Sequence, residues 1–202
     1  MDSQTLSRYS RNARSLPDSG LMTASTISVA RDPREFEARL DEHRGIVFKV
    51  ADTYCPDREE RDDLVQEICL QLWRSYPGYD PERRFSTWMY RVALNTAISF
   101  ARTTRARERR VVPLEESGAR ETAETPRPHE RDERIARLYR FLYGLAELDR
   151  ALVVLYLEER SYREIAEVLG ISETNVGTKL GRLKQKMRRD LVADKETENG
   201  AR

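Results

Sequence analysis

Hydrophobic residues recur at helical spacing in two stretches of the chain. In the first stretch, apolar side chains return every three or four positions over 36–54, 58–76 and 88–100. This period predicts three helices. Two prolines and a glycine in 77–81 predict a loop before the third helix, because neither residue type suits a helix interior. Ser86 is the expected N-cap of the third helix.

The helical period resumes in the second half of the chain. A helix is expected over 133–148, and a short, very apolar helix over 149–158. Ser161 and Glu164 then form a capping-box pattern, in which each side chain satisfies a backbone N–H at the start of a helix. That helix should end at Gly170, because glycine tolerates the left-handed backbone of a helix end.

The residues after this capping box have the spacing of a helix-turn-helix. Ala166 is small enough to let two helices cross closely, Gly170 makes the turn, and Ile171 and Val176 pack the second helix on the first. Ser172 should cap this second helix, which runs to about residue 191. No strand pattern appears anywhere in the chain.

We therefore expect an all-α fold of two small helical domains joined by a flexible linker, with the helix-turn-helix in the C-terminal domain. Pro, Gly and charged residues interrupt the pattern between the domains, and the N-terminal residues are rich in Ser, Thr and Arg without a period. The expected divisions are a disordered extension over 1–32, a helical domain over 33–104, a linker over 105–131, a helical domain over 132–191 and a disordered tail over 192–202.

Composition excludes several classes of protein. The chain has 35% charged residues but a net charge of only +1, which argues against a uniformly basic nucleic-acid coat protein. The longest apolar run, 151–157, is far shorter than the roughly 20 residues of a membrane-spanning helix, and no secretory signal is visible. Two isolated cysteines and two isolated histidines argue against a disulfide framework and against a zinc site. We expect a cytoplasmic protein without cofactor, metal or membrane insertion.

The charge that does cluster lies on the second helix of the helix-turn-helix. Residues 174–189 hold six basic side chains and no carboxylate: Lys179, Arg182, Lys184, Lys186, Arg188 and Arg189. An ordinary helical hairpin with a solvated basic face would also have this appearance. Neutralising phosphate is, however, the main source of affinity for DNA, and such a helix fits the major groove. DNA binding is therefore favoured.

Both halves resemble conserved regions of bacterial sigma factors of the sigma-70 family. The segments DLVQE at 63–67, YDPE at 79–82 and FSTWMYRVALN at 85–95 resemble the second conserved region. The segment SYREIAEVLGIS at 161–172 resembles the fourth. The order and separation resemble the extracytoplasmic-function group, which keeps only these two domains. The resemblance implies a transcription-initiation factor without an active site, which binds core RNA polymerase, directs it to promoters and helps to open the duplex.

The resemblance also implies where the polymerase binds. In the family, the acidic helix face of region 2 docks on a coiled coil of the beta-prime subunit, and the beta subunit is a further partner. The matching positions here are Asp63, Gln66, Glu67, Leu70 and Trp73. Carboxylates beside apolar residues suit a protein interface, in which charge steers and apolar contacts anchor. Without the rest of the pattern, a solvated acidic face would be the first interpretation.

Recognition and melting of the minus-ten element are implied for the loop and helix after Trp73. The matching residues are Tyr79, Arg83, Arg84, Ser86, Thr87, Trp88, Arg91 and Asn95. Flipping a base out of the stack costs a few kcal/mol, and stacking on an aromatic ring returns about 1–3 kcal/mol per base. Trp73 and Phe85 are expected to be mainly core residues, while the role of Trp88 stays open.

The minus-thirty-five element is implied to be read by the last helix. The matching residues are Ser172, Thr174, Asn175, Thr178, Lys179, Arg182 and Lys186. Gly177 and Gly181 depart from the family pattern, which more often has larger side chains there. Either the helix approaches the DNA backbone closely at these glycines or readout depends on other residues, and we favour the first interpretation.

The sequence is compatible with a further partner and with two other functions. The family resemblance implies an anti-sigma factor as partner, although no residue pattern shows one. A stand-alone helix-turn-helix regulator would bind duplex DNA without polymerase. A nuclease using Asp62, Asp63 and Glu67 is disfavoured, because no histidine or further clustered acid completes a metal site.

Overall fold

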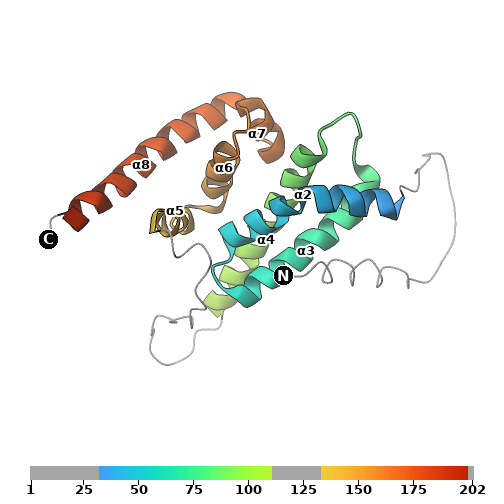
Figure 1. Ribbon diagram of the computed structural model, residues 1–202, viewed down its shortest axis with the longest axis horizontal. Coiled ribbons are helices and arrows are strands. Elements are labelled where there is room, and N and C mark those ends of the chain that lie inside the picture. The colour runs from blue at the N-terminus through green and yellow to red at the C-terminus, as the bar shows by residue number, and fades with distance from the viewer. Residues whose placement is uncertain (1–31, 111–132, 200–202) are drawn as a thin grey trace.

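The computed structural model describes residues 32–110 and 133–199. All regular secondary structure in these ranges is helical. The predicted all-α class is therefore confirmed. We call the first group of helices the N-terminal lobe: α2 (Pro33–Tyr54), α3 (Arg58–Ser75), a 3₁₀ turn (Tyr76–Gly78) and α4 (Phe85–Arg110). The second group is the C-terminal lobe: α5 (Glu133–Tyr143), α6 (Glu147–Leu157), α7 (Tyr162–Leu169) and α8 (Glu173–Asn199) (Figure 1).

The N-terminal lobe is a three-helix core in which α2 and α3 begin at side-chain caps. Asp32 accepts a hydrogen bond from Arg34 N at the start of α2, and Asp57 accepts two at the start of α3. Each satisfies backbone N–H groups that a helix start leaves unpaired. The apolar stripes of the three helices meet in a buried core that includes Leu64 and Met89. This packing leaves the polar face of α3 toward solvent.

The C-terminal lobe contains the predicted helix-turn-helix. The capping box is present: Ser161 Oγ accepts the N–H of Glu164 at 3.2 Å, and a Glu164 carboxylate oxygen accepts the N–H of Ser161 at 2.9 Å. Gly170 has φ +67° and ends α7 in the left-handed conformation. Val176 on α8 is fully buried. These features orient α8 across α7.

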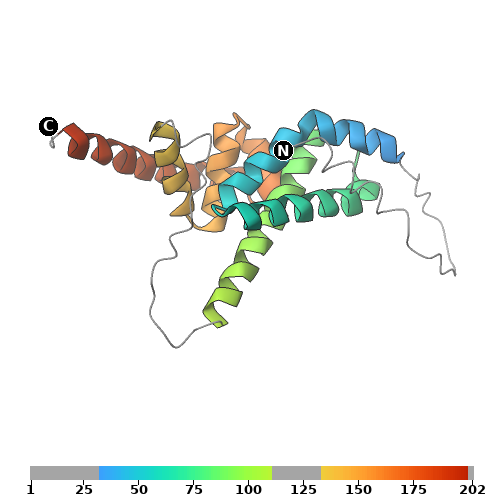
Figure 2. The same cartoon turned by 60° about the horizontal axis from the view of Figure 1, so that its bottom comes forward.

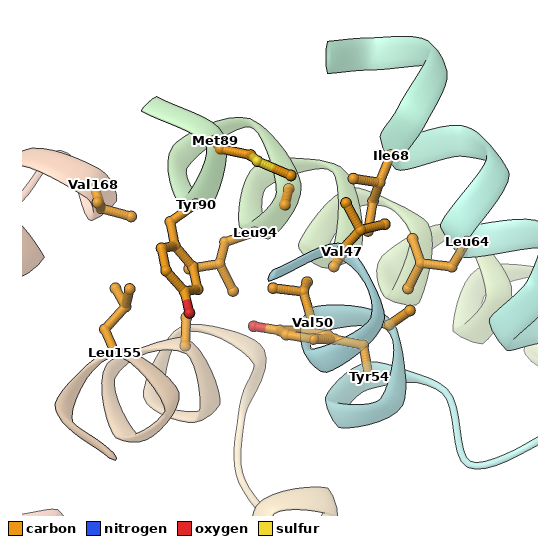
Figure 3. Close-up of a cluster of buried hydrophobic side chains, with 14 of the residues drawn as sticks. Val47, Val50, Tyr54, Leu64, Ile68, Met89, Tyr90, Leu94, Leu155 and Val168 are labelled. Carbon is orange, nitrogen blue, oxygen red and sulfur yellow. The ribbon is translucent and has the colours of Figure 1, made fainter. Parts of the chain in front are cut away.

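The two lobes lie against each other. Figures 1 and 2 show α6 and α7 beside α2 and α4, while the C-terminal half of α8 points away from the N-terminal lobe. Buried side chains of both lobes form one continuous hydrophobic cluster. In Figure 3, Leu155 of α6 and Val168 of α7 face Tyr90 of α4. The sequence predicted two helical domains joined by a linker, and it did not predict this contact between them.

Two local expectations differ from the structure. Ser86 is not the N-cap of α4: the helix begins at Phe85, and the backbone carbonyl of Arg84 already accepts the N–H of Trp88. The helix expected over 133–148 is broken after Tyr143 by a turn, and α6 begins at Glu147. Within that turn the N–H of Leu145 bonds the carbonyl of Leu142.

Two helices are also longer than expected. The helix α4 continues through 105–110, where linker was expected, and Arg105 pairs with Glu147 at 2.6 Å. The helix α8 continues through 192–199, where a tail was expected. Arg, Ala and Glu fill 105–110, and Ala, Lys and Glu make up half of 192–199; all of these residues are good helix formers. The expectations of disorder over 1–31, 111–132 and 200–202 lie outside the described residues. No helix of the described ranges is long and apolar enough to span a membrane.

Candidate functional site

The polar face of α3 carries the residues for which polymerase binding is predicted. Asp63 and Gln66 are exposed, and Glu67 is half-buried and accepts a hydrogen bond from Gln71 at 2.8 Å. Leu70 and Trp73 are half-buried. Their spacing of three and four residues puts them on one helix face. The face thus combines exposed carboxylate and amide groups with partly exposed apolar groups.

Trp73 is held in place by the N-terminal lobe's own aromatic residues. Its ring packs edge-on against Phe36, with centroids 5.3 Å apart. Phe36 in turn packs against Tyr76 at 5.0 Å. The apolar end of the α3 face is therefore rigid, which lowers the entropy lost when a partner binds there.

Tyr79 is a core residue and not an exposed base platform. Its ring is 4% exposed and lies 5.3 Å from Phe85 and 5.2 Å from Trp88. Its hydroxyl donates to the carbonyl of Arg83 at 2.6 Å and so fixes the loop. Phe85 is also buried, whereas Trp88 is half-buried. Of these three rings, Trp88 alone keeps an intermediate surface on which a base could stack.

The remaining residues predicted for the minus-ten element lie in two different surroundings. Arg91 and Asn95 are exposed on α4, and Thr87 is buried. Arg83 and Arg84 are exposed in the loop before α4. These two arginines face the C-terminal lobe, where they pair with carboxylates of α7.

The helix α8 presents to solvent most of the residues predicted for DNA binding. Thr174, Asn175, Thr178 and Arg182 are exposed, and Lys179 and Lys186 are half-buried. Ser172 accepts the N–H of Asn175 at 3.2 Å, so the predicted cap is confirmed. The ammonium of Lys179 lies 3.4 Å from the carboxylate of Asp149, so its charge is partly compensated within the lobe. Arg182 and Lys186 lie on the same helix and are suited to contacts with phosphate.

The two glycines of this helix differ in their surroundings. A Cβ added at Gly177 would lie 3.6 Å from Cε2 of Tyr162, an ordinary van der Waals distance. A Cβ added at Gly181 would meet nothing within 4 Å. Neither glycine is therefore required by packing inside the chain.

A polar groove between α3 and α4 was not predicted. It is lined by residues that include Glu67 and Gln71 of α3 and Asn95, Ser99 and Thr103 of α4. The groove joins the face predicted for polymerase to a residue predicted for the minus-ten element. The spacing of Asn95, Ser99 and Thr103 by four residues was the signal for a polar helix face.

The residues named for a nuclease do not make a metal site. Within the described part of the chain, no group of three or more His, Cys, Asp or Glu side chains is placed to hold a metal ion. The acidic residues of α3 are spread along its solvent face instead.

Comparison with protein families matches each lobe to a conserved region of one family. The family model of sigma-70 region 2 matches residues 40–107, and that of sigma-70 region 4 matches residues 135–187. Together they cover more than half of the chain. Each match falls within one lobe, in the order expected from the sequence.

Relatives of the whole chain agree with these matches. The RNA polymerase sigma factor CnrH of Cupriavidus metallidurans is 27% identical over 172 residues, covering 81% of this chain and 90% of CnrH. The ECF RNA polymerase sigma factor SigE of Mycolicibacterium smegmatis is 31% identical over 161 residues. That match covers 78% of this chain and 61% of SigE.

Solved structures share the fold. CnrH in complex with the cytosolic domain of CnrY has a TM-score of 0.59 at 24% identity, covering 83% of this chain and 94% of that chain. The sigma factor RpoE of Bartonella quintana, in complex with the anti-sigma factor NepR, also has a TM-score of 0.59, at 17% identity, covering 80% and 99%. From the two matched regions and these relatives, the chain belongs to the extracytoplasmic-function group of the sigma-70 family and is a transcription-initiation sigma factor.

Proposed function

We propose that this chain binds core RNA polymerase through α3, opens promoters through the loop before α4, and reads the minus-thirty-five element through α8. The observation that carries the proposal is that each family region falls on a separate lobe, and that each lobe exposes the polar face expected of it.

For polymerase binding, the composition of the α3 face is the support. Asp63 and Gln66 are exposed, and Trp73 is packed against Phe36. Charged groups at a rim steer association, and a fixed aromatic group at the centre supplies an anchor. We propose the beta-prime subunit as the partner of this face and the beta subunit as a partner of the C-terminal lobe.

For promoter opening, the proposed residues divide by role. Arg83, Arg84 and Arg91 are exposed cations that suit phosphate, and Asn95 suits a base edge. Trp88 is the aromatic ring on which an unpaired base would stack. Tyr79 shapes the loop through its bond to Arg83 and does not take a base.

For the minus-thirty-five element, α8 is the proposed reading helix. Its exposed residues near the start, Thr174, Asn175 and Thr178, suit base edges, and Arg182 suits either a base or a phosphate. The chain acts without an active site of its own and works in the cytoplasm, beside the polymerase. Because RpoE is solved with an anti-sigma factor, we propose that this chain also has such a partner.

The test is transcription in vitro with core polymerase that lacks any sigma factor. We expect the chain to give discrete start sites, mapped by sequencing the 5′ ends of transcripts. A chain that binds duplex promoter DNA tightly alone, and gives no start sites with core, would be a stand-alone regulator and would refute the proposal.

A charge-reversal variant tests the polymerase face. Asp63→Lys with Glu67→Lys should abolish co-purification with core while leaving helical content, measured by circular dichroism, unchanged. The matched control is Asp41→Lys with Glu42→Lys, which reverses two exposed charges on α2 instead. Retained core binding by the α3 variant, or equal loss in both variants, would contradict the assignment.

A second substitution tests the reading helix. Arg182→Ala should lower promoter-dependent initiation, because it weakens the free energy of promoter binding by about 1–3 kcal/mol if its contact is bidentate to a base. Core binding should not change, because Arg182 is exposed on the face of α8 proposed for DNA and lies outside the α3 face proposed for the beta-prime subunit. Unchanged transcript levels would remove Arg182 from the proposed site.

A further inference from the structure

One side of α8, which we call the glycine flank, has almost no side chains. Gly177, Gly181 and Lys184 follow one another at spacings of four and three residues, so they lie along one side of the helix. Val176 and Leu180, on the adjoining side, are fully buried against the rest of the lobe. The glycine flank is therefore bare backbone that ends at a cation.

The aromatic ring of Tyr162 borders the glycine flank. A Cβ at Gly177 would lie 3.6 Å from Cε2 and 3.8 Å from Cδ2 of Tyr162, so one edge of the ring faces the bare backbone. Tyr162 begins α7, and the capping box of Ser161 and Glu164 fixes the backbone there. Leu157 and Tyr162 are the exposed large hydrophobic residues of the described ranges. A ring held in this way offers an apolar contact at little cost in entropy.

Lys184 lies at the far end of the glycine flank. Its ammonium donates to the hydroxyl of Tyr162 at 3.4 Å and lies 4.0 Å from the ring centre of Tyr156. Hydrogen bonds to Tyr156 and Tyr162 outweigh desolvation and raise the pKa of Lys184. Because both partners are neutral phenols, the ammonium keeps its charge for a phosphate, the main source of affinity for DNA.

The glycine flank adjoins the face of α8 proposed for the minus-thirty-five element. Gly177 and Gly181 each lie three residues after an exposed threonine of that face, Thr174 and Thr178, and residues three apart are neighbours on a helix surface. DNA that contacts these threonines would therefore meet the glycine backbone next, and the ring of Tyr162 beyond it.

The missing side chains decide how closely DNA can approach. A helix is about 10–12 Å across with its side chains, whereas its Cα atoms lie about 2.3 Å from the axis, so the bare flank lies about 3 Å nearer the axis than a flank with side chains. The major groove is about 12 Å wide, so a helix with side chains all round fills it. On the glycine flank, one wall of the groove can move about 3 Å closer to α8, toward the exposed ring of Tyr162.

We propose that Tyr162 of α7 reads a thymine of the minus-thirty-five element across the glycine flank, while Lys184 binds a phosphate beside it. The C5-methyl group of thymine is the apolar feature of the base edges in the major groove, and apolar side chains recognise it. The ring suits this methyl group because its hydroxyl is already engaged by Lys184. The inference rests on the proposed function of α8 and adds a specificity-determining residue outside that helix.

The first experiment measures the base preferences of the holoenzyme. Core polymerase assembled with the chain selects from a duplex library, built on a promoter found by start-site mapping, whose minus-thirty-five segment is randomised. We expect the parent to prefer thymine at one position, Tyr162→Phe to keep this preference and Tyr162→Ala to lose it there alone. Loss in Tyr162→Phe would assign the readout to the hydroxyl, and a preference retained in Tyr162→Ala would exclude Tyr162. Either result overturns the proposal.

Removing the methyl group from the DNA is the complementary test. Deoxyuridine in place of the selected thymine should weaken binding of the parent holoenzyme about fourfold, which is the effect of one buried methyl group. The same replacement should not change binding of the Tyr162→Ala holoenzyme. Equal effects on the two holoenzymes, whether a loss or none, would overturn the proposal.

A side chain on the glycine flank should block this readout. Gly177→Leu should abolish the thymine preference, because the added side chain would stand between the ring and the DNA, although leucine suits a helix interior better than glycine. The matched control is Gly45→Leu, at an exposed glycine of α2 where an added Cβ meets nothing within 4 Å. The control should keep the preference. A preference that survives in Gly177→Leu would contradict the close approach.

Lys184→Gln tests the phosphate contact. Affinity should fall by a similar factor for every selected sequence, and the slope of log affinity against log salt concentration should become shallower by about one. A changed preference at a single base position would instead make Lys184 a base-reading residue and overturn this part of the proposal.

The results separate this inference from the proposed function. A holoenzyme that selects a minus-thirty-five sequence without any thymine preference overturns the role of Tyr162 and leaves the proposed function of α8 in place. A chain that gives core polymerase no sequence preference in this segment refutes the proposed function of α8, and the inference with it.

Discussion

Replacing Gly170 with alanine should destabilise the chain, whereas the same replacement at Gly181 should stabilise it. Gly170 has φ +67°, a conformation in which an L residue brings its Cβ too close to its own carbonyl oxygen. Gly181 lies inside α8 with ordinary helical backbone. One substitution thus acts with opposite sign at two positions only eleven residues apart along the helix-turn-helix.

The magnitudes follow from the backbone alone. A Cβ at either glycine would meet nothing within 4 Å, so neither variant gains or loses packing. Alanine in the left-handed region costs about 1–2 kcal/mol. Alanine in place of glycine inside a helix gains up to about 1 kcal/mol. For a chain of this size, about 1 kcal/mol moves the melting temperature by about 2–4 °C.

The assay is urea unfolding followed by circular dichroism. Gly170→Ala should lower the midpoint and Gly181→Ala should raise it, with the slope of each transition unchanged. The same two proteins also test the interpretation of Gly181 as a point of close approach to DNA. If that interpretation is correct, Gly181→Ala weakens promoter binding although it makes the protein more stable.

Two outcomes would refute this reasoning. A Gly170→Ala variant with the stability of the parent would show that the turn does not need left-handed backbone. Equal shifts of the same sign in both variants would show that the effect comes from the unfolded chain, in which both lose the same glycine freedom.

Two further predictions concern titrating groups. Burial raises the pKa of the Cys55 thiol to about 12 and that of the Cys69 thiol to about 11. Since only the thiolate reacts, Ellman's reagent at pH 8 should react with neither cysteine in the native chain and with both in urea. Rapid reaction without denaturant would contradict this burial. The pKa of Glu158 is lowered in the native chain, so its ionised carboxylate stabilises the native chain at pH values above the ordinary pKa of 4.5. This stabilisation is lost as the pH falls through the lowered pKa. Unfolding free energy should therefore fall less on acidification in Glu158→Gln than in the parent, and parallel curves would exclude this contribution.

Local rules predicted most of the secondary structure. The capping box at Ser161 and the turn at Gly170 were found as expected, because both depend on residues adjacent in the chain. The break between α5 and α6 was missed, since Leu145 keeps the helical period although it lies in a turn. Ser86 was misassigned as a cap because Phe85 can begin the helix without a side-chain cap, a difference of one residue that propensity does not resolve.

The contact between the lobes was beyond such rules. Tyr90, Leu155 and Val168 each fit the apolar stripe of their own helix, so nothing in their spacing marks them as partners across the chain. Glu158 directly follows α6 and belongs to no motif that marks its partners. Site residues on exposed faces, such as Asp63 and Arg182, were named by family resemblance, and their surface position does not by itself assign a role.

The shortness of α7 has a consequence for motion within the chain. With eight residues it is too short to persist as an isolated helix in water, so its order depends on its caps and on the burial of Ile165 and Val168. The buried side of α7 packs against α8, and its outer carboxylates pair with Arg83 and Arg84 of the loop before α4. Fraying of this one segment would therefore loosen α8 and the loop before α4 together, and faster exchange of the α7 amide protons with solvent would report it.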